Sequence, residues 1–351
     1  MTKAESHKAT PLIEAAAKVP VTILTGYLGA GKTTLLNRIL SEDHGRKFAV
    51  IVNEFGEIGI DNDLVIDTDE EIFEMNNGCL CCTVRGDLIR IVNGLMKRAG
   101  RFDAILIETT GLADPGPVAQ TFFMDEDVRE KTRLDSVVTV TDAKHLLARL
   151  ADAPEAKEQI AFADVILVNK TDLLSEEEIS EVEARIRAIN PYARLHRTVQ
   201  SAIAIADVLD RGAFDLDRIL TLEPDFLESD HDLHGHDHHG HDHAHHHHKH
   251  YHDEEMGSLS FRTDQDLNPQ VFFAWIGRVV DTMGQDILRT KGILSFKDDP
   301  ERYVLQGVHM MIEGDSQRPW RDDEKRESRL VFIGRNLPKD TLEAGFKACL
   351  A

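Results

Sequence analysis

The feature that most constrains this chain is the segment Gly26–Thr33, with the sequence GYLGAGKT. It follows an apolar run at Val19–Thr25 and opens a helical pattern at Lys32–Ser41. The segment matches G-x-x-x-x-G-K-[ST], in which glycines let backbone N–H groups approach phosphates at a helix N-terminus. Because run, loop and helix stand in the required order, the sequence predicts a phosphate-binding loop between a strand and a helix.

Further apolar runs predict strands that are buried on both faces of a parallel sheet. Helical patterns alternate with these runs, and the last of them opens on the capping-box sequence Ser175-Glu176-Glu177-Glu178. The alternation predicts an α/β fold of the P-loop NTPase type, with a doubly wound, mostly parallel sheet. The runs are Val19–Thr25, Phe48–Asn53, Ala104–Glu108, Val137–Thr141 and Val165–Asn169, and the helical patterns are Lys32–Ser41, Asp87–Ala99 and Ser175–Ile189.

Changes in composition divide the chain into four parts. We expect a flexible leader at 1–18, the P-loop domain at 19–225, a linker at 226–256 and a smaller α+β domain at 257–351. The linker is predicted to be disordered, because 13 of the 18 histidines lie within 231–252 among Asp and Gly, which cannot fill a core. In the last part, strands are predicted at Leu259–Arg262, Ile293–Phe296, Tyr303–Val308 and Leu330–Ile333, and helices at Pro269–Met283 and Lys339–Leu350.

The charge of the chain excludes several classes of partner. A net charge of -22 argues against nucleic acid, which needs a basic surface, and against an anionic membrane surface. No stretch approaches the roughly 18 apolar residues of a membrane span. The polar N-terminus lacks the apolar core of a signal peptide, and three of the four cysteines are too close together for a disulfide framework. We therefore expect a cytoplasmic protein.

Residues of the phosphate-binding loop can be given individual roles. Backbone groups of Gly26, Gly29, Ala30 and Gly31 are expected to surround the phosphates, with Thr34 completing the set. Lys32 is predicted to reach the β and γ phosphates, and the Thr33 hydroxyl to bind Mg²⁺.

A second motif, Asn169-Lys170-Thr171-Asp172, lies at the end of the run Val165–Asn169. An Asp172 carboxylate at this place can accept hydrogen bonds from guanine N1–H and the N2 amine, a donor pair that adenine lacks. The nucleotide is therefore predicted to be GTP, with Asn169, Lys170 and Asp172 at the base. Ser201-Ala202 is a weaker candidate for a second guanine loop.

Glu108 closes the run Ala104–Glu108 and precedes Thr109-Thr110-Gly111. We expect Glu108 to hold the water shell of Mg²⁺ and Gly111 to lie close to the γ-phosphate. The alternative is a strand-end carboxylate that faces solvent. The segment 53–57 (NEFGE) falls where a switch segment is expected, and no glutamine stands in an obvious place to position the attacking water.

A cluster of thiols, Cys79, Cys81 and Cys82, indicates a metal site. Thiolates suit Zn²⁺, Cu⁺ or Co²⁺, and a C-x-C-C cluster can present two or three sulfurs to one ion. Three buried cysteines or a redox-active disulfide are the alternatives, although the surrounding residues are polar. The His/Asp tract 231–252 is predicted to bind metal loosely, with a solvated linker as its alternative.

Together these residues resemble the CobW-type family of P-loop GTPases, which is related to the GTPases that insert nickel into urease and hydrogenase. The resemblance covers about residues 19–350. The matching segments are Gly26–Thr34, Asn53–Gly56, Cys79–Cys82, Glu108–Pro115 and Asn169–Asp172, followed by a His-rich linker and a C-terminal domain with Gly307-Val308 and Arg318-Pro319-Trp320.

The resemblance implies a GTP-driven metallochaperone with low intrinsic GTPase activity and a client metalloprotein. It implies Zn²⁺ or Co²⁺ as the metal, held by Cys79, Cys81 and Cys82, with Glu57 as a candidate additional ligand. It leaves open whether the chain serves zinc homeostasis, cobalamin synthesis or nitrile hydratase activation, and it names neither the client nor the oligomeric state. A passive metal buffer and a redox-sensing GTPase are the rival interpretations.

Overall fold

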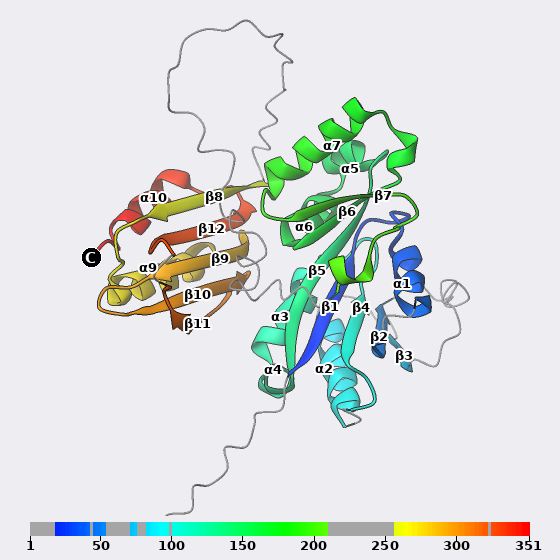
Figure 1. Ribbon diagram of the computed structural model, residues 1–351, viewed down its shortest axis with the longest axis horizontal. Helices are drawn as coiled ribbons and strands as arrows, with labels where there is room; N and C mark the ends of the chain where they lie inside the picture. The colour runs from blue at the N-terminus through cyan, green and yellow to red at the C-terminus, as the bar shows by residue number, and fades with distance from the viewer. Residues whose placement is uncertain are drawn as a thin grey trace, which may run out of the picture.

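Seven parallel strands form the first sheet of the computed structural model, in the order β3-β2-β4-β1-β5-β6-β7 (Figure 1). The structure describes residues 18–42, 45–53, 71–75, 82–97, 100–209, 256–321 and 324–351, with only the backbone of 53, 71–75 and 82–85. The strands are β1 Val19–Thr25, β2 Phe48–Asn53, β3 Glu71–Met75, β4 Ala104–Glu108, β5 Thr132–Asp142, β6 Val165–Asn169 and β7 Arg194–Thr198.

Helices cover both faces of this sheet. On one face α1 packs with the short helix at Ile205–Asp207 and the residues that follow it, and on the other lie α2, α3, α6 and α7. The capping box at Ser175 is confirmed at the start of α7, whereas α2 begins at Cys82, five residues before the prediction. The helices are α1 Lys32–Ser41, α2 Cys82–Met96, α3 Gly116–Met124, α4 Glu126–Lys131, α5 Leu146–Asp152, α6 Pro154–Phe162 and α7 Glu176–Ile189.

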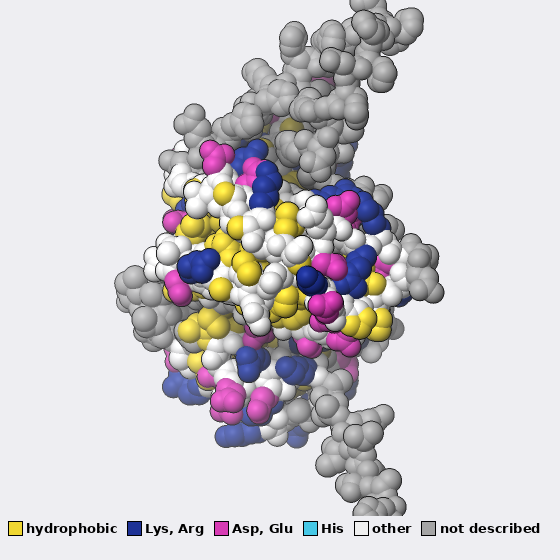
Figure 2. Space-filling model, turned by 90° about the vertical axis from the view of Figure 1, so that its left-hand side faces the viewer, with side chains coloured by type: hydrophobic (Ala, Val, Ile, Leu, Met, Phe, Trp, Pro, Cys, Tyr) yellow, Lys and Arg dark blue, Asp and Glu magenta, His cyan; other side chains and the backbone are white. Residues whose placement is uncertain are grey.

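A second sheet of five antiparallel strands forms the C-terminal domain, in the order β11-β10-β9-β12-β8. Helices α9 and α10 cover one of its faces and enclose an aromatic core with it. Figure 2 views the molecule from this side, where hydrophobic side chains lie among charged ones. The elements are β8 Met256–Thr263, α9 Pro269–Met283, β9 Ile287–Ser295, β10 Glu301–Val308, β11 Met311–Pro319, β12 Ser328–Arg335 and α10 Lys339–Lys347.

The predicted fold class is confirmed: a doubly wound α/β sheet, here wholly parallel, is followed by a smaller α+β unit. Three strands escaped the sequence analysis, namely β3, β7 and β11, and all three are edge strands. Strands β7 and β11 are mostly polar, which discourages pairing with other chains at a sheet edge, and they therefore present no apolar run. No helix among the described residues has the length and apolar character needed to cross a membrane.

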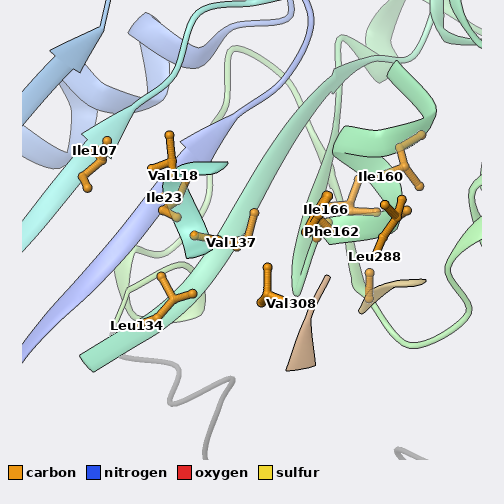
Figure 3. Packing of buried hydrophobic residues seen from close by; sticks show 14 of the residues in the cluster. Ile23, Ile107, Val118, Leu134, Val137, Ile160, Phe162, Ile166, Leu288 and Val308 are labelled. Carbon is orange, nitrogen blue, oxygen red and sulfur yellow. The ribbon is translucent and has the colours of Figure 1, made fainter. Parts of the chain in front are cut away.

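The two sheets pack against each other through α3 and α6. Val308 and Leu288 of the second sheet belong to the same buried cluster as Val137 of β5 and Phe162 of α6 (Figure 3). The face of the second sheet opposite α9 and α10 is therefore buried against the nucleotide domain. One hydrophobic core thus spans the two units.

A buried group of charges lies within this interface. Asp164, which directly precedes β6, accepts hydrogen bonds from Arg289 at 2.6 Å and Lys291 at 2.7 Å, both on β9. Its second oxygen accepts from the Val137 backbone N–H at 2.8 Å. Burial raises the pKa of Asp164, but the two cations and the backbone N–H outweigh this and keep the pKa below its usual range.

We expect Asp164→Asn to lower the free energy of unfolding by about 3 kcal/mol, because removing one partner leaves buried cations uncompensated. Urea unfolding at pH 7 measures this. Arg129→Gln is the matched control, since it breaks the interdomain pair between Arg129 and Glu313, which is half exposed and contributes at most about 1 kcal/mol. Equal losses in the two variants would contradict the role given to Asp164.

The same carboxylate predicts a dependence of stability on pH. Because the pKa of Asp164 is lower in the folded protein than the ordinary 3.8, its stabilising contribution is present above that value and is lost as the pH falls through the folded pKa. Urea midpoints measured from pH 6 downward should therefore fall more steeply for the natural chain than for Asp164→Asn. Parallel curves for the two proteins would contradict this assignment.

Candidate nucleotide-binding site

The loop between β1 and α1 has the backbone that a phosphate-binding loop requires. Gly26, Gly29 and Gly31 all have positive φ angles. Gly31, at φ 114°, directly precedes α1, and a Cβ at this position would lie 2.5 Å from the Asn169 side-chain nitrogen. Only glycine fits this conformation and this space, so the fold requires the glycine directly before α1.

Lys32 turns back over this loop. Its Nζ donates a hydrogen bond to the Gly26 carbonyl at 2.8 Å and a longer one to the Tyr27 carbonyl at 3.4 Å. The residue is only 8 % exposed, so its ammonium group is buried within the loop. This arrangement provides positive charge where phosphate oxygens are predicted to bind.

Oxygen donors for a cation meet beside the loop. Thr33 Oγ1 donates to Glu108 Oε1 at 3.4 Å, and Glu108, the last residue of β4, is buried. The alternative that Glu108 faces bulk solvent is therefore wrong. Hydroxyl and carboxylate oxygens are the donors that Mg²⁺ prefers, so these two residues fit the predicted ion.

Asn169 joins three loops at the carboxyl ends of the strands. Its Nδ2 donates to the Ala30 carbonyl at 2.8 Å, and its Oδ1 accepts from the Ser201 backbone N–H at 2.8 Å and from Thr198 Oγ1 at 3.1 Å. Ser201 also donates from Oγ to the Gly31 carbonyl at 3.0 Å. The weakly predicted loop at Ser201 is thus attached directly to the phosphate-binding loop.

Lys170 bridges the two predicted motifs. At φ 63°, it donates from Nζ to the Gly29 carbonyl and to Asp142 Oδ2, each at 2.7 Å. His145 Nδ1 lies 3.1 Å from the same carboxylate oxygen. Burial raises the pKa of Asp142, yet the hydrogen bonds from Lys170 and His145 prevail and lower it.

A cavity of about 440 Å³ adjoins the loop. Tyr27, Leu28 and Gly29 of the loop line it together with His145, Lys170 and residues of β5, α5 and α6. The Arg149 guanidinium lies over the Tyr27 ring, 5.3 Å from its centroid. Asp172 lies in the short helix Thr171–Leu173, and its side chain is exposed and accessible to a base.

Several predicted residues lie outside the described ranges. They are Glu57, Cys79, Cys81, the side chain of Cys82, the segment 54–57 and the His-rich tract 231–252. Within the residues that the structure does describe, no group of three or more His, Cys, Asp or Glu is placed to hold a metal ion. The metal-binding roles stay predictions.

Sequence reasoning missed two residues of this site, Asp142 and Gln159. Asp142 ends β5 and therefore stands at the same sheet edge as Asn169, with which it is in register. The position of Asp142 directly after a predicted strand could therefore have identified it from the sequence as a residue of this site. Gln159 lies within α6 and donates to the carbonyls of Gly111 and Ala113, and no sequence spacing indicates a contact of this kind.

We expect Lys32→Ala to weaken GTP binding about a hundredfold, roughly 3 kcal/mol, because the phosphates lose a buried positive partner. Titration with a fluorescent GTP analogue measures the affinity. Lys144→Ala, an exposed lysine just past β5, is the matched control and should bind like the natural chain. Natural affinity in Lys32→Ala would remove the phosphate-binding assignment.

Comparison with known proteins finds a family match for each of two parts of the chain. Residues 20–197 match the family described as "CobW/HypB/UreG, nucleotide-binding domain", and residues 256–350 match the "Cobalamin synthesis protein cobW C-terminal domain". The chain is 34 % identical to the zinc chaperone YjiA of Escherichia coli, with 93 % of this chain and 98 % of that protein covered. It is 36 % identical to the zinc chaperone CobW of Pseudomonas aeruginosa, with coverage of 95 % and 92 %.

A eukaryotic relative and a solved structure extend this likeness. The zinc-regulated GTPase metalloprotein activator 1 of Schizosaccharomyces pombe is 37 % identical, with 91 % of this chain and 83 % of that protein covered. The crystal structure of zinc-bound YjiA GTPase from E. coli superimposes with a TM-score of 0.71 at 28 % identity, covering 95 % of this chain and 100 % of that one. By residues 20–197 this chain belongs to the CobW/HypB/UreG family of nucleotide-binding proteins, and residues 256–350 add the C-terminal domain of cobW.

Proposed function

We propose that this protein hydrolyses GTP and uses the nucleotide cycle to control the binding of Zn²⁺ and its delivery to a client metalloprotein. Zn²⁺ is the favoured cargo and Co²⁺ the second candidate. In this proposal Cys79, Cys81 and Cys82 bind the cargo, with Glu57 as a candidate additional ligand. The client's identity is left open.

The observation that carries the proposal is the position in the sheet of Met75, the last described residue before the thiols. Strand β3 pairs in parallel with β2, and its last residue, Met75, is in register with Asn53. β2 in turn pairs with β4, where Val52 is in register with Glu108. Strand β3 therefore ends at the carboxyl edge that carries Glu108 and the phosphate-binding loop, and Cys79 and Cys81 follow it in the sequence before α2 begins at Cys82.

The names of relatives support the choice of metal and nucleotide. Two bacterial relatives are named zinc chaperones, and the relative from S. pombe is named a zinc-regulated GTPase metalloprotein activator. Each aligns over more than nine-tenths of this chain. We extend both properties, zinc handling and GTP hydrolysis, to this protein.

The chain's own residues supply most of what phosphoryl transfer needs. Lys32 and the backbone N–H groups of the loop would hold the β and γ phosphates and stabilise charge that develops in the reaction. Thr33 and Glu108 would hold Mg²⁺, which supplies further neutralisation of the phosphate charge when bound. Lys170 and Asp172 would orient the guanine base.

The rest of the chain has a place in the proposal. We assign GTP hydrolysis to residues 19–225 and loose metal capture to the His-rich segment within 226–256, and we place residues 257–351 as a second domain. Thiolates must remain reduced to bind metal, so we also propose that the protein works in the cytoplasm. Neither nucleic acid nor a membrane is needed as a partner.

We expect Asp172→Asn to reduce the preference for GTP over ATP at least tenfold, because an amide cannot accept both guanine donors. Competition of GTP and ATP for a labelled guanine nucleotide measures the preference. Asp207→Asn, in the short helix at Ile205–Asp207, is a control that makes the same chemical change away from the base motif. An unchanged preference in Asp172→Asn would show that the base is recognised by other residues.

The coupling itself predicts that a non-hydrolysable GTP analogue with Mg²⁺ tightens Zn²⁺ binding, and that Cys81→Ser removes this gain. A serine hydroxyl stays protonated and is a poor zinc ligand, whereas a thiolate is a good one. Zn²⁺ affinity is measured by competition with a chelating dye. By linkage, Zn²⁺ must tighten binding of the GTP analogue by the same factor. A coupling free energy of about 2 kcal/mol corresponds to a factor of some tens.

The matched control is Cys349→Ala, which removes the fourth cysteine, buried in the core of the C-terminal domain. It should retain both Zn²⁺ affinity and the response to nucleotide. Identical Zn²⁺ affinity with GTP analogue, GDP and no nucleotide would leave a metal buffer rather than a nucleotide-gated chaperone. A disulfide among Cys79, Cys81 and Cys82 that tracks GTP turnover would favour the redox-sensing alternative.

A further inference from the structure

The loop of residues 109–115 connects Glu108 to α3 and lies against the phosphate-binding loop. A Cβ on Gly111 would lie 2.6 Å from the backbone nitrogen of Leu28, so the two backbones are in direct contact. At the start of the loop, Thr109 donates from its backbone N–H to the Leu24 carbonyl at 2.9 Å. The position of this loop therefore determines which protein groups lie next to the terminal phosphate of a bound nucleotide.

A single buried side chain fixes the backbone of this loop. Gln159 of α6 donates from Nε2 to the Gly111 carbonyl at 3.2 Å and to the Ala113 carbonyl at 3.1 Å. The side chain is 1 % exposed, and its own backbone carbonyl accepts from Thr139 Oγ1 of β5 at 2.8 Å. Because one amide nitrogen holds both carbonyls, a shift of α6 would displace the part of the loop from Gly111 to Ala113.

The C-terminal domain reaches the far end of the same loop through His309. This residue, at φ 50°, lies in the turn between β10 and β11. Its Nε2 would lie 2.6 Å from a Cβ on Gly116, the first residue of α3, and its ring packs 5.2 Å from that of Phe162. The imidazole thus fills the space that glycine leaves open at the start of α3.

Electrostatics join His309 to the loop as well. Asp114 Oδ1 accepts from the Gly116 backbone N–H at 2.8 Å and so closes the loop. Burial lowers the pKa of His309, and Arg335 lowers it too, while Asp114 and the hydrogen bond with the Gln285 backbone raise it; the net direction is downward. The lowered pKa favours the neutral imidazole, which meets the start of α3 by packing.

A second residue of the C-terminal domain, Arg335, holds the helix that carries Gln159. Arg335 ends β12 and forms an ion pair with Glu158 of α6, the neighbour of Gln159. Burial and the nearby Asp114 raise the pKa of Glu158, and Arg335 opposes this. Without Arg335, the carboxylates of Glu158 and Asp114 would repel each other beside the loop with no positive charge to offset them.

We propose that the C-terminal domain supplies positioning residues for GTP hydrolysis, with His309 bracing the start of α3 and Arg335 bracing α6, so that the loop 109–115 is held against the phosphate-binding loop. This inference rests on the proposed GTPase activity. It gives the C-terminal domain a direct part in the reaction, in addition to any contact with a client.

The test uses the full chain and compares His309→Ala and Arg335→Gln with the natural protein in GTP hydrolysis. We expect kcat to fall about ten- to a hundredfold in each, because the loop is misplaced. KM should change less than twofold, since Lys32 and the base-binding residues are untouched. Arg335→Lys should recover most of the lost rate, because it keeps the charge opposite Glu158.

Arg129→Gln separates this role from general support at the domain interface. It breaks another interdomain ion pair, at 3.0 Å between α4 and β11, which does not touch the loop. We expect its kcat to match the natural chain even if its melting temperature falls as much as that of Arg335→Gln. Natural kcat in both His309→Ala and Arg335→Gln, or an equal loss in Arg129→Gln, would overturn the inference.

The two proposals fail in different ways. If the natural chain shows no GTP hydrolysis, the proposed function is wrong. If it hydrolyses GTP, and His309→Ala and Arg335→Gln do so at the natural rate, only the role given to His309 and Arg335 is wrong. Should His309→Ala fail to fold, Arg335→Gln and its rescue by Arg335→Lys decide the question alone.

Discussion

The nucleotide site depends on one carboxamide, that of Asn169. Its nitrogen donates to the phosphate-binding loop and its oxygen accepts from Thr198 and Ser201, so a single planar group sets the spacing of three loops. Neither aspartate, which cannot donate, nor a hydroxyl, which is too short, could make this set of contacts. The protein's own hydrogen bonds therefore hold these loops at a set spacing.

The strand that carries Asn169 also carries the domain interface. All five residues of β6 are buried, and Asp164, directly before it, holds Arg289 and Lys291 of the second sheet. One short, fully packed strand thus connects the nucleotide loops to the C-terminal domain. Because protein interiors are close-packed and yield little, such a strand fixes the position of the second domain relative to the site. The buried charges make that docking specific, since a mispositioned sheet would leave Asp164 unpaired.

The sequence alone was sufficient for the central strands and insufficient for contacts between elements, while the binding roles given to the two nucleotide motifs stay predictions. Apolar runs identify β1, β4 and β6 because these strands are buried on both faces, whereas the polar edge strands β7 and β11 give no such signal. Local motifs likewise predicted Lys32, Thr33 and Asn169. Gln159 and His309 could not be found in this way, because each is defined by a partner far away in the chain, at Gly111 and Gly116.

A layer of helices lies between the two sheets, and its order bears on how nucleotide and metal could communicate. Helix α2, which begins at Cys82, packs against α3, and Leu88 of α2 and Val118 of α3 both belong to the shared core. Helix α3 begins where the loop 109–115 ends and contacts β10 and β11 on its other side. Helix α3 is therefore in contact with α2 and with the C-terminal sheet, and it begins at the end of the loop 109–115. Because protein interiors are close-packed and yield little, a shift at the start of α3 would have to be accommodated in its packing against both of these neighbours.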